Sequence, residues 1–282
     1  MIIDAHTHIF PQNIRSNKEK YFADEPAFKK LYQSPKSRLI GARELIASMD
    51  DSQVDKAVVF GFPWIDPLLF KRHNDYISEV VNRYPQRFIG LGCFDPFSDG
   101  AAEETRRCLQ KAGLAGIGEL AFYQNGIENS ALTRLEPVME ICQDLDRAVM
   151  IHTNEPIGHS YPGKTPSTLA QIYQLIHTFP QNKIILAHWG GGLFFFSLLK
   201  KEVKTSLKNV YFDTAASPYL YDADVYRLAI DLVGEKKILF GSDFPLLPPG
   251  RYFDEMKTAG LSDAEMEQIC GGNAARLFNI AD

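Results

Sequence analysis

The chain has 282 residues, a length that suits a single α/β barrel, and its 45% hydrophobic and 23% charged residues are ordinary for a globular protein. A net charge of −5 argues against nucleic acid as a partner, and no apolar run approaches the ~20 residues that a membrane-spanning helix needs. Four scattered cysteines without a C-x-x-C pair, together with the absence of a basic and apolar leader, favour a cytoplasmic protein.

Short β-rich runs alternate with amphipathic helical segments along the whole chain. We expect eight strands, at residues 2–8, 56–61, 88–94, 116–120, 148–153, 183–188, 210–214 and 238–243. Apolar residues at helical spacing predict intervening helices at 74–84, 135–145 and 168–179. Alternating strands and helices imply parallel strands joined by right-handed crossovers. Eight such units predict an α/β fold, a single (β/α)8 TIM-barrel domain over residues 1–282.

A long insertion without helical or strand periodicity follows strand one, from residue 10 to about residue 38. Connections of that length are uncommon in compact domains unless they have a function. Two interpretations stay open: a lid or dimer element over the barrel mouth, or decoration packed on the barrel. The first allows a homodimer. Residues 190–199, Gly-Gly-Gly-Leu-Phe-Phe-Phe-Ser-Leu-Leu, predict a glycine-rich turn into a buried helix.

Ionisable side chains recur where the expected strands end. His6 and His8 end strand one, and both rings point the same way because extended chain alternates its faces. Later strand ends supply Glu119, His152, His188 and Asp243. Taken singly, each has a structural explanation, such as an ion pair or a turn cap. Together these explanations fail, because burying several unpaired ionisable groups is costly unless they share a partner, and we predict a divalent metal site.

The loop after strand five, at 154–164, is expected to overhang the barrel mouth. Substrate contacts are predicted from Glu155, His159, Tyr161 and Lys164, with a solvated loop as the alternative. The two tryptophans, Trp64 and Trp189, either wall the substrate pocket or belong to the core. The histidines of the helical segments, His73 and His177, are expected to be structural or on the surface.

Five motifs carry a family resemblance: Asp-Ala-His-Thr-His8, Ile-His-Thr153, Ala-His-Trp-Gly-Gly191, Gly-Ser-Asp-Phe-Pro245 and Gly-Asn-Ala-Ala-Arg-Leu-Phe278. With them the chain resembles the amidohydrolase superfamily, in its "amidohydrolase 2" branch of TIM-barrel metal-dependent hydrolases. That branch also contains the aminocarboxymuconate-semialdehyde decarboxylase type enzymes. The resemblance implies that His6, His8, His152 and Asp243 bind a divalent metal. It also implies that His188 binds a second metal or acts in proton transfer.

Glu119 departs from the decarboxylase-like members, which need no strand-four carboxylate. It is more similar to the acidic residue that bridges two metals in TatD-type hydrolases. We therefore expect a metal-dependent hydrolase with one or two ions per chain, zinc first and manganese second. The predicted substrate is a small ester, lactone or amide. Water activated by the metal would be the nucleophile, with Asp243 transferring its proton and His188 stabilising the oxyanion.

Two alternatives remain. One is a mononuclear zinc-dependent non-oxidative decarboxylase, a lyase acting on an aromatic or dienoic acid, with Arg38 or Arg43 holding the substrate carboxylate. The other is a binding protein that has kept its metal but performs no catalysis. Carbon dioxide release would favour the first alternative, and inertness across broad substrate panels would favour the second.

Overall fold

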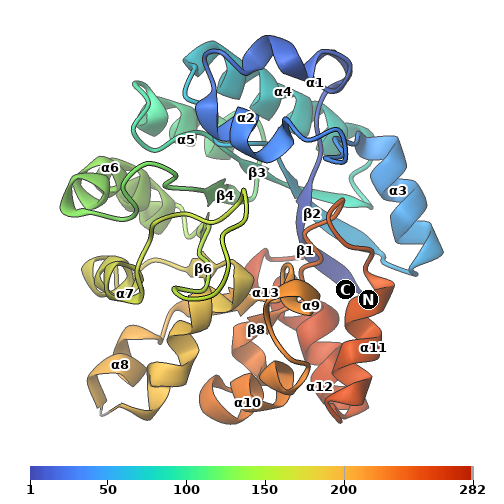
Figure 1. Ribbon diagram of the computed structural model, residues 1–282, viewed down its shortest axis with the longest axis vertical. Coiled ribbons are helices and arrows are strands. Elements are labelled where there is room, and N and C mark those ends of the chain that lie inside the picture. Colours follow the sequence, from blue (N-terminus) through green and yellow to red (C-terminus); the bar gives the residue numbers. More distant parts are fainter. Residues whose placement is uncertain (200, 281–282) are drawn as a thin grey trace.

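The eight β-rich runs pair in chain order, each parallel to the next, and helices surround them (Figure 1). This arrangement is seen in a computed structural model that describes residues 1–199 and 201–280. The sheet closes between its first and last members through the bridge from Thr7 to Phe244, and through the Ala5 N–H, which donates to the Phe240 carbonyl oxygen at 2.7 Å. The predicted TIM-like barrel of eight parallel strands is confirmed.

The strands are β1 (Ile3–His8), β2 (Lys56–Phe60), β3 (Phe88–Gly92), β4 (Gly116–Leu120), β5 (Ala148–Ile151), β6 (Ile184–Leu186), β7 (Val210–Asp213) and β8 (Ile238–Leu239). The α-helices are α1 (Gln12–Arg15), α2 (Pro26–Tyr32), α3 (Ala42–Asp51), α4 (Pro67–Arg83), α5 (Ala101–Gln110), α6 (Asn129–Asp144), α7 (Leu169–Thr178), α8 (Lys201–Ser206), α9 (Ser217–Leu220), α10 (Asp224–Val233), α11 (Gly250–Thr258), α12 (Asp263–Glu267) and α13 (Asn273–Leu277). The 3-10 helices are η1 (Lys18–Tyr21), η2 (His188–Leu198) and η3 (Glu235–Lys237), and η4 (Gln268–Gly272) is a π-helix.

Local sequence explains where the longer helices begin. The Asp66 side chain accepts the Leu68 N–H, and Pro67 occupies the first helical position, so α4 begins seven residues before the predicted start at residue 74. At α7, Thr168 and Gln171 form a capping box, which agrees with the predicted start. These crossovers bring the carboxyl ends of all eight strands to one side of the barrel.

The segment after β1 is not the long irregular insertion that the sequence predicted. It forms α1, η1 and α2, and it buries Ile14 and Phe28 against the barrel. The Phe28 ring lies 4.5 Å from the ring of Trp64, between centroids. These helices have four to seven residues each, too short to give a clear helical period in the sequence.

The predicted buried helix at 190–199 is only half buried. The structure places it in η2, where Phe194 is buried but Phe195, Phe196 and Leu198 are exposed. Trp189 and the three glycines that follow it all have positive φ, from 61° to 87°, so no continuous helix with one buried face forms over residues 190–199. Elsewhere, the four cysteines are buried and free. Within residues 1–199 and 201–280, no helix is both long and apolar enough to cross a membrane.

Candidate metal centre and active site

His6 and His8 lie at the carboxyl end of β1 and turn their Nε2 atoms toward each other. The Nδ1 of His6 lies 2.9 Å from Asp213 Oδ2, and the Nδ1 of His8 lies 3.2 Å from the Gly61 carbonyl oxygen. Because both partners are acceptors, each ring donates from Nδ1 and presents Nε2 to the site. The two Nε2 atoms are 3.3 Å apart. That spacing suits two ligands, each about 2.1 Å from one shared ion.

His152 and His188 follow β5 and β6 and repeat this arrangement from the other side. The Nε2 of His152 donates to the Gly163 carbonyl oxygen at 3.0 Å, and the Nδ1 of His188 donates to the Ala215 carbonyl oxygen at 2.9 Å. Their remaining nitrogens face Glu119 Oε1, at 2.8 Å for His152 Nδ1 and 3.4 Å for His188 Nε2. All four histidines therefore use one nitrogen to fix the ring and aim the other into the site.

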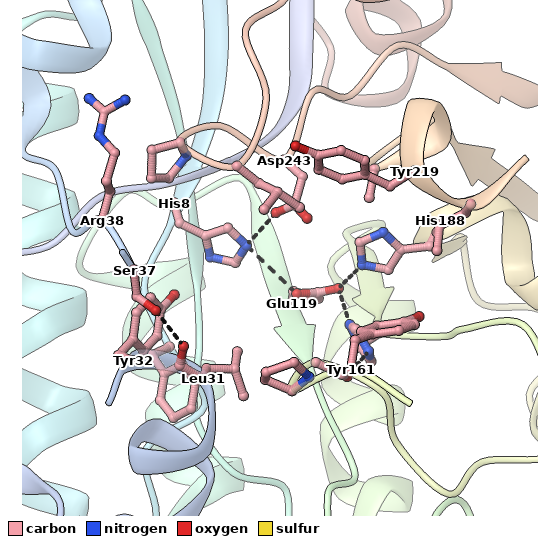
Figure 2. A pocket seen from close by; sticks show the side chains of 18 of the residues that line it. His8, Leu31, Tyr32, Ser37, Arg38, Glu119, Tyr161, His188, Tyr219 and Asp243 are labelled. Carbon is pink, nitrogen blue, oxygen red and sulfur yellow. Dashed lines mark hydrogen bonds and ion pairs between the residues drawn. The ribbon is translucent and has the colours of Figure 1, made fainter. Parts of the chain in front are cut away.

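Two carboxylates complete the cluster. Glu119, in β4, has its Oε2 atom 3.8 Å from the Nε2 atoms of both His6 and His8. Asp243, which follows β8, has its Oδ1 atom 3.6 Å from His6 Nε2 and 3.3 Å from His8 Nε2. Figure 2 shows Glu119 between His8 and His188, with Asp243 on the same side of the His8 ring as Glu119.

The cluster attracts positive charge. Burial opposes a charged His6 ring, but the Asp213, Glu119 and Asp243 carboxylates outweigh it and raise the pKa of His6 to about 10. For His188, burial is likewise outweighed, mainly by Glu119, and the pKa rises to about 9. Burial would raise the pKa of Glu119 and Asp243, yet the surrounding histidines hold the pKa of Asp243 below its usual value and that of Glu119 well below.

These residues fit a divalent metal ion. Three overlapping groups have ligand atoms within 4.8 Å of one another: His6, His8 and Glu119; His6, His188 and Asp243; and Glu119, His152 and His188. Imidazole nitrogens and carboxylate oxygens are the donors that zinc and manganese take in proteins. A divalent ion would supply the positive charge that the buried carboxylates stabilise.

The cluster forms the floor of a cavity of about 780 Å³. Its aromatic lining residues are Tyr32, Phe62, Tyr123, Tyr161 and Tyr219. Phe62 and Tyr123 lie nearly parallel, with ring centroids 6.4 Å apart and an interplanar angle of 17°. Arg38 lies at the edge, and Figure 2 shows its guanidinium group directed away from Glu119. The cavity thus combines an apolar wall with a charged floor, as small-molecule sites do.

A family model described as Amidohydrolase matches residues 3–280. The chain belongs to the amidohydrolase family. It is 28% identical to a 2-amino-3-carboxymuconate-6-semialdehyde decarboxylase from Dictyostelium discoideum, over 99% of this chain and 91% of the relative. It is 26% identical to a gamma-resorcylate decarboxylase from Polaromonas sp., over 74% and 76%. A 5-carboxyvanillate decarboxylase from Novosphingobium aromaticivorans, solved with bound manganese, has the same fold at a TM-score of 0.79 and 18% identity, over 99% and 97%.

These comparisons overturn the prediction of a hydrolase. The curated relatives are named decarboxylases, which are lyases, and they match along most or all of the chain. The hydrolase prediction depended on Glu119, whose carboxylate was expected to bridge two metals. A carboxylate among histidines specifies a cation site, whereas the bond that is broken also depends on the substrate held above that site.

The structure separates the loop residues that were predicted to contact substrate. His159 and Tyr161 line the cavity. Glu155 and Lys164 instead pair with each other at 2.8 Å and line a neighbouring hollow of about 550 Å³. Glu155 also accepts the Tyr161 hydroxyl at 2.8 Å, so this ion pair sets where the Tyr161 ring lies.

The two tryptophans belong to the core and do not line the cavity. Both are fully buried, and each indole N–H is satisfied there: Trp64 Nε1–H donates to His73 Nδ1 at 2.9 Å, and Trp189 Nε1–H donates to the Ser217 hydroxyl at 2.9 Å. His73 is structural, as expected, and His177 lies exposed in the last turn of α7.

Among the site residues that sequence reasoning missed are Asp213, Tyr32 and Tyr123. Asp213 ends β7 and is the last residue but one of the predicted strand 210–214, so the rule that found the other strand-end residues applied to it as well. Tyr123 follows β4 by three residues, a position that faces the mouth in a barrel. Tyr32 ends α2 in the presumed insertion, and no pattern in the sequence marked it.

Proposed function

We propose that this protein is a metal-dependent non-oxidative decarboxylase of a small aromatic or dienoic carboxylic acid. The observation that carries the proposal is a cluster of four histidines and two carboxylates at the floor of an aromatic-walled cavity. The decarboxylase names of the curated relatives support this reaction class, and a homodimer and a cytoplasmic location remain predictions.

The ligands that we propose are His6, His8, Glu119 and Asp243, whose facing atoms lie 3.3–3.8 Å apart. The residues His152 and His188 face the other oxygen of Glu119 and offer a second set of donors. One or two ions per chain are compatible with this arrangement. Zinc suits the histidines, and manganese is supported by its presence in a structure of the same fold.

In decarboxylation the bond between the substrate carbon and its carboxylate breaks, the electron pair stays on that carbon, and a proton replaces the lost carbon dioxide. A divalent ion bound here supplies Lewis-acid polarisation of the substrate oxygens. His188 is suited to deliver the proton, because Ala215 fixes its Nδ1 and its Nε2 faces the cavity. Asp243, beside His8, would help to hold the ion that withdraws electron density from the substrate, and both residues are therefore proposed as catalytic.

Arg38 is proposed to hold a substrate carboxylate. It lines the cavity, has no ion-pair partner within residues 1–199 and 201–280, and so is available to an anion. Arg43, the other sequence candidate, lies exposed on α3 and does not line the cavity. The faces of Phe62 and Tyr123 would pack on an aromatic ring or a diene, while His159 and Tyr161 close the opposite wall.

The test is carbon dioxide release from a panel of carboxylic acids by protein loaded with zinc or manganese. The panel contains 2,6-dihydroxybenzoate, 5-carboxyvanillate and 2-amino-3-carboxymuconate semialdehyde, with chelator-treated protein as the control. We expect release from at least one acid and none after chelation. Metal-loaded protein that releases no carbon dioxide from any of them would contradict the proposal and favour a binding protein without catalysis.

A further inference from the structure

Asp213, the last residue of β7, is fully buried and does not line the cavity. It nevertheless contacts two sides of the metal centre. Its Oδ2 accepts the His6 Nδ1–H at 2.9 Å. Its Oδ1 accepts the main-chain N–H groups of His188 at 2.9 Å and Ala215 at 3.0 Å.

This set of donors leaves the carboxylate a single arrangement. Oδ1 is occupied by two main-chain N–H groups, so only Oδ2 remains for His6. An acceptor at that position keeps the proton of His6 on Nδ1 and leaves Nε2 to face His8 Nε2 at 3.3 Å.

The contact with His188 has a separate consequence. The His188 backbone lies in the left-handed region at φ 54°, which a residue other than glycine adopts only when its surroundings hold it there. The Asp213 carboxylate binds the N–H of that residue, and the carbonyl oxygen of Ala215 accepts the His188 Nδ1–H. The ends of β1, β6 and β7 are thus tied together at one buried group.

We infer that Asp213 is the positioning residue of the metal centre. It selects the Nε2 atom of His6 as the ligand atom, and it fixes the place of His188 relative to it. The inference rests on the proposed metal-dependent function, because it gives Asp213 a role in metal binding. It gives Asp213 no role in substrate binding. Mutation of a residue that accepts a hydrogen bond from a metal-binding histidine typically lowers metal affinity by about 10- to 100-fold.

Asp213→Asn tests this selection with almost no change in volume. The main-chain N–H groups of His188 and Ala215 need an oxygen, so the Asn amide nitrogen has to face His6 Nδ1. A donor there removes the proton from Nδ1 and leaves one on Nε2. His6 Nε2–H then donates to His8 Nε2 and no longer offers a lone pair to a cation.

Zinc affinity is measured by competition with a chromophoric chelator. The His6 nitrogen that carries the proton is identified by ¹⁵N NMR of the zinc-loaded protein. We expect Asp213→Asn to weaken zinc binding by about 10- to 100-fold, and we expect the zinc-loaded wild-type protein to keep its proton on Nδ1. Glu104→Gln is the matched control, because Glu104 is also a buried carboxylate but bonds Asn74 and Arg107 on the outer wall. We expect this control to keep both wild-type properties.

Wild-type zinc affinity in Asp213→Asn would overturn the inference while leaving the proposed function intact. A wild-type protein that takes up no zinc or manganese would instead overturn the proposed function. The wild-type spectrum keeps the inference testable if Asp213→Asn does not fold, because an unprotonated His6 Nδ1 there would also contradict it.

Discussion

Replacing Arg38 with Met removes a guanidinium that lines the cavity while keeping much of the side chain's length. We expect the KM for a carboxylate substrate to rise and kcat to stay near the wild-type value. The reason is that Arg38 lies at the edge of the cavity, with its guanidinium directed away from Glu119 and the rest of the cluster. Its contribution is therefore to binding, equal in the ground state and the transition state.

The size of the effect follows from the exposure of Arg38. A hydrogen bond to a charged group contributes about 1.5–3 kcal/mol when it is shielded, whereas an exposed ion pair contributes about 0.2–1 kcal/mol. Arg38 is exposed and has no protein partner within residues 1–199 and 201–280, so we expect about 1 kcal/mol, equivalent to about a fivefold higher KM. Added salt should narrow the difference, because mobile ions screen exposed charges.

Steady-state carbon dioxide release by Arg38→Met and Arg43→Met measures this effect. Arg43→Met is the control, since Arg43 carries the same charge but lies outside the cavity. We expect its KM to match wild type. An Arg38→Met enzyme with an unchanged KM, or with an equal loss from Arg43→Met, would refute the placement of the substrate carboxylate at Arg38.

Three further substitutions probe the centre and the wall behind it. Asp243→Asn should lower turnover by about 100-fold or more while circular dichroism stays unchanged, and retained turnover would remove Asp243 from catalysis. In Gly241→Ala the added carbon would lie 2.7 Å from His6 Cβ. We therefore expect this variant to bind metal more weakly and to lose about 1–3 kcal/mol of stability in denaturant unfolding. Wild-type metal affinity and stability would contradict this packing. Burial lowers the pKa of His73 from 6.5 to about 4, so only the unfolded chain takes up its proton as the pH falls through that window. Stability should thus drop by about 2 kcal/mol between roughly pH 6.5 and pH 5, and His73→Gln should abolish that part of the loss. Urea unfolding at the two pH values measures this, and an identical drop in the variant would contradict it.

The strand-end rule located most of the centre because parallel barrel strands deliver their last residues to one face. His6 and Asp243 are far apart in the chain. Because each ends an apolar strand, the sequence predicted that their side chains lie close together. Asp213 also stands at a strand end, but its role behind His6 was not predictable, because a sequence does not say which buried donor a carboxylate will face. The tryptophans show the same limit, since Trp64 is held in the core by a hydrogen bond to His73 that leaves no local pattern.

The metal-binding residues alone do not determine which reaction the site catalyses. His6, His8 and Glu119 form a divalent metal site, and a metal site was predicted from their positions at strand ends. The choice between hydrolysis and decarboxylation depends on the groups above the cation, which include Tyr32 from the presumed insertion and Tyr123 from a loop. Their convergence is a property of the folded cavity.

The most direct test of the proposed decarboxylation is the fate of the substrate carbon in deuterated water. Metal-loaded protein is incubated with whichever acid of the panel it consumes, and both carbon dioxide and the organic product are analysed by mass spectrometry. We predict one carbon dioxide for each substrate molecule, and one deuterium on the carbon that had carried the carboxylate. A product that retains its carboxylate and has gained oxygen from the solvent would contradict decarboxylation at this centre.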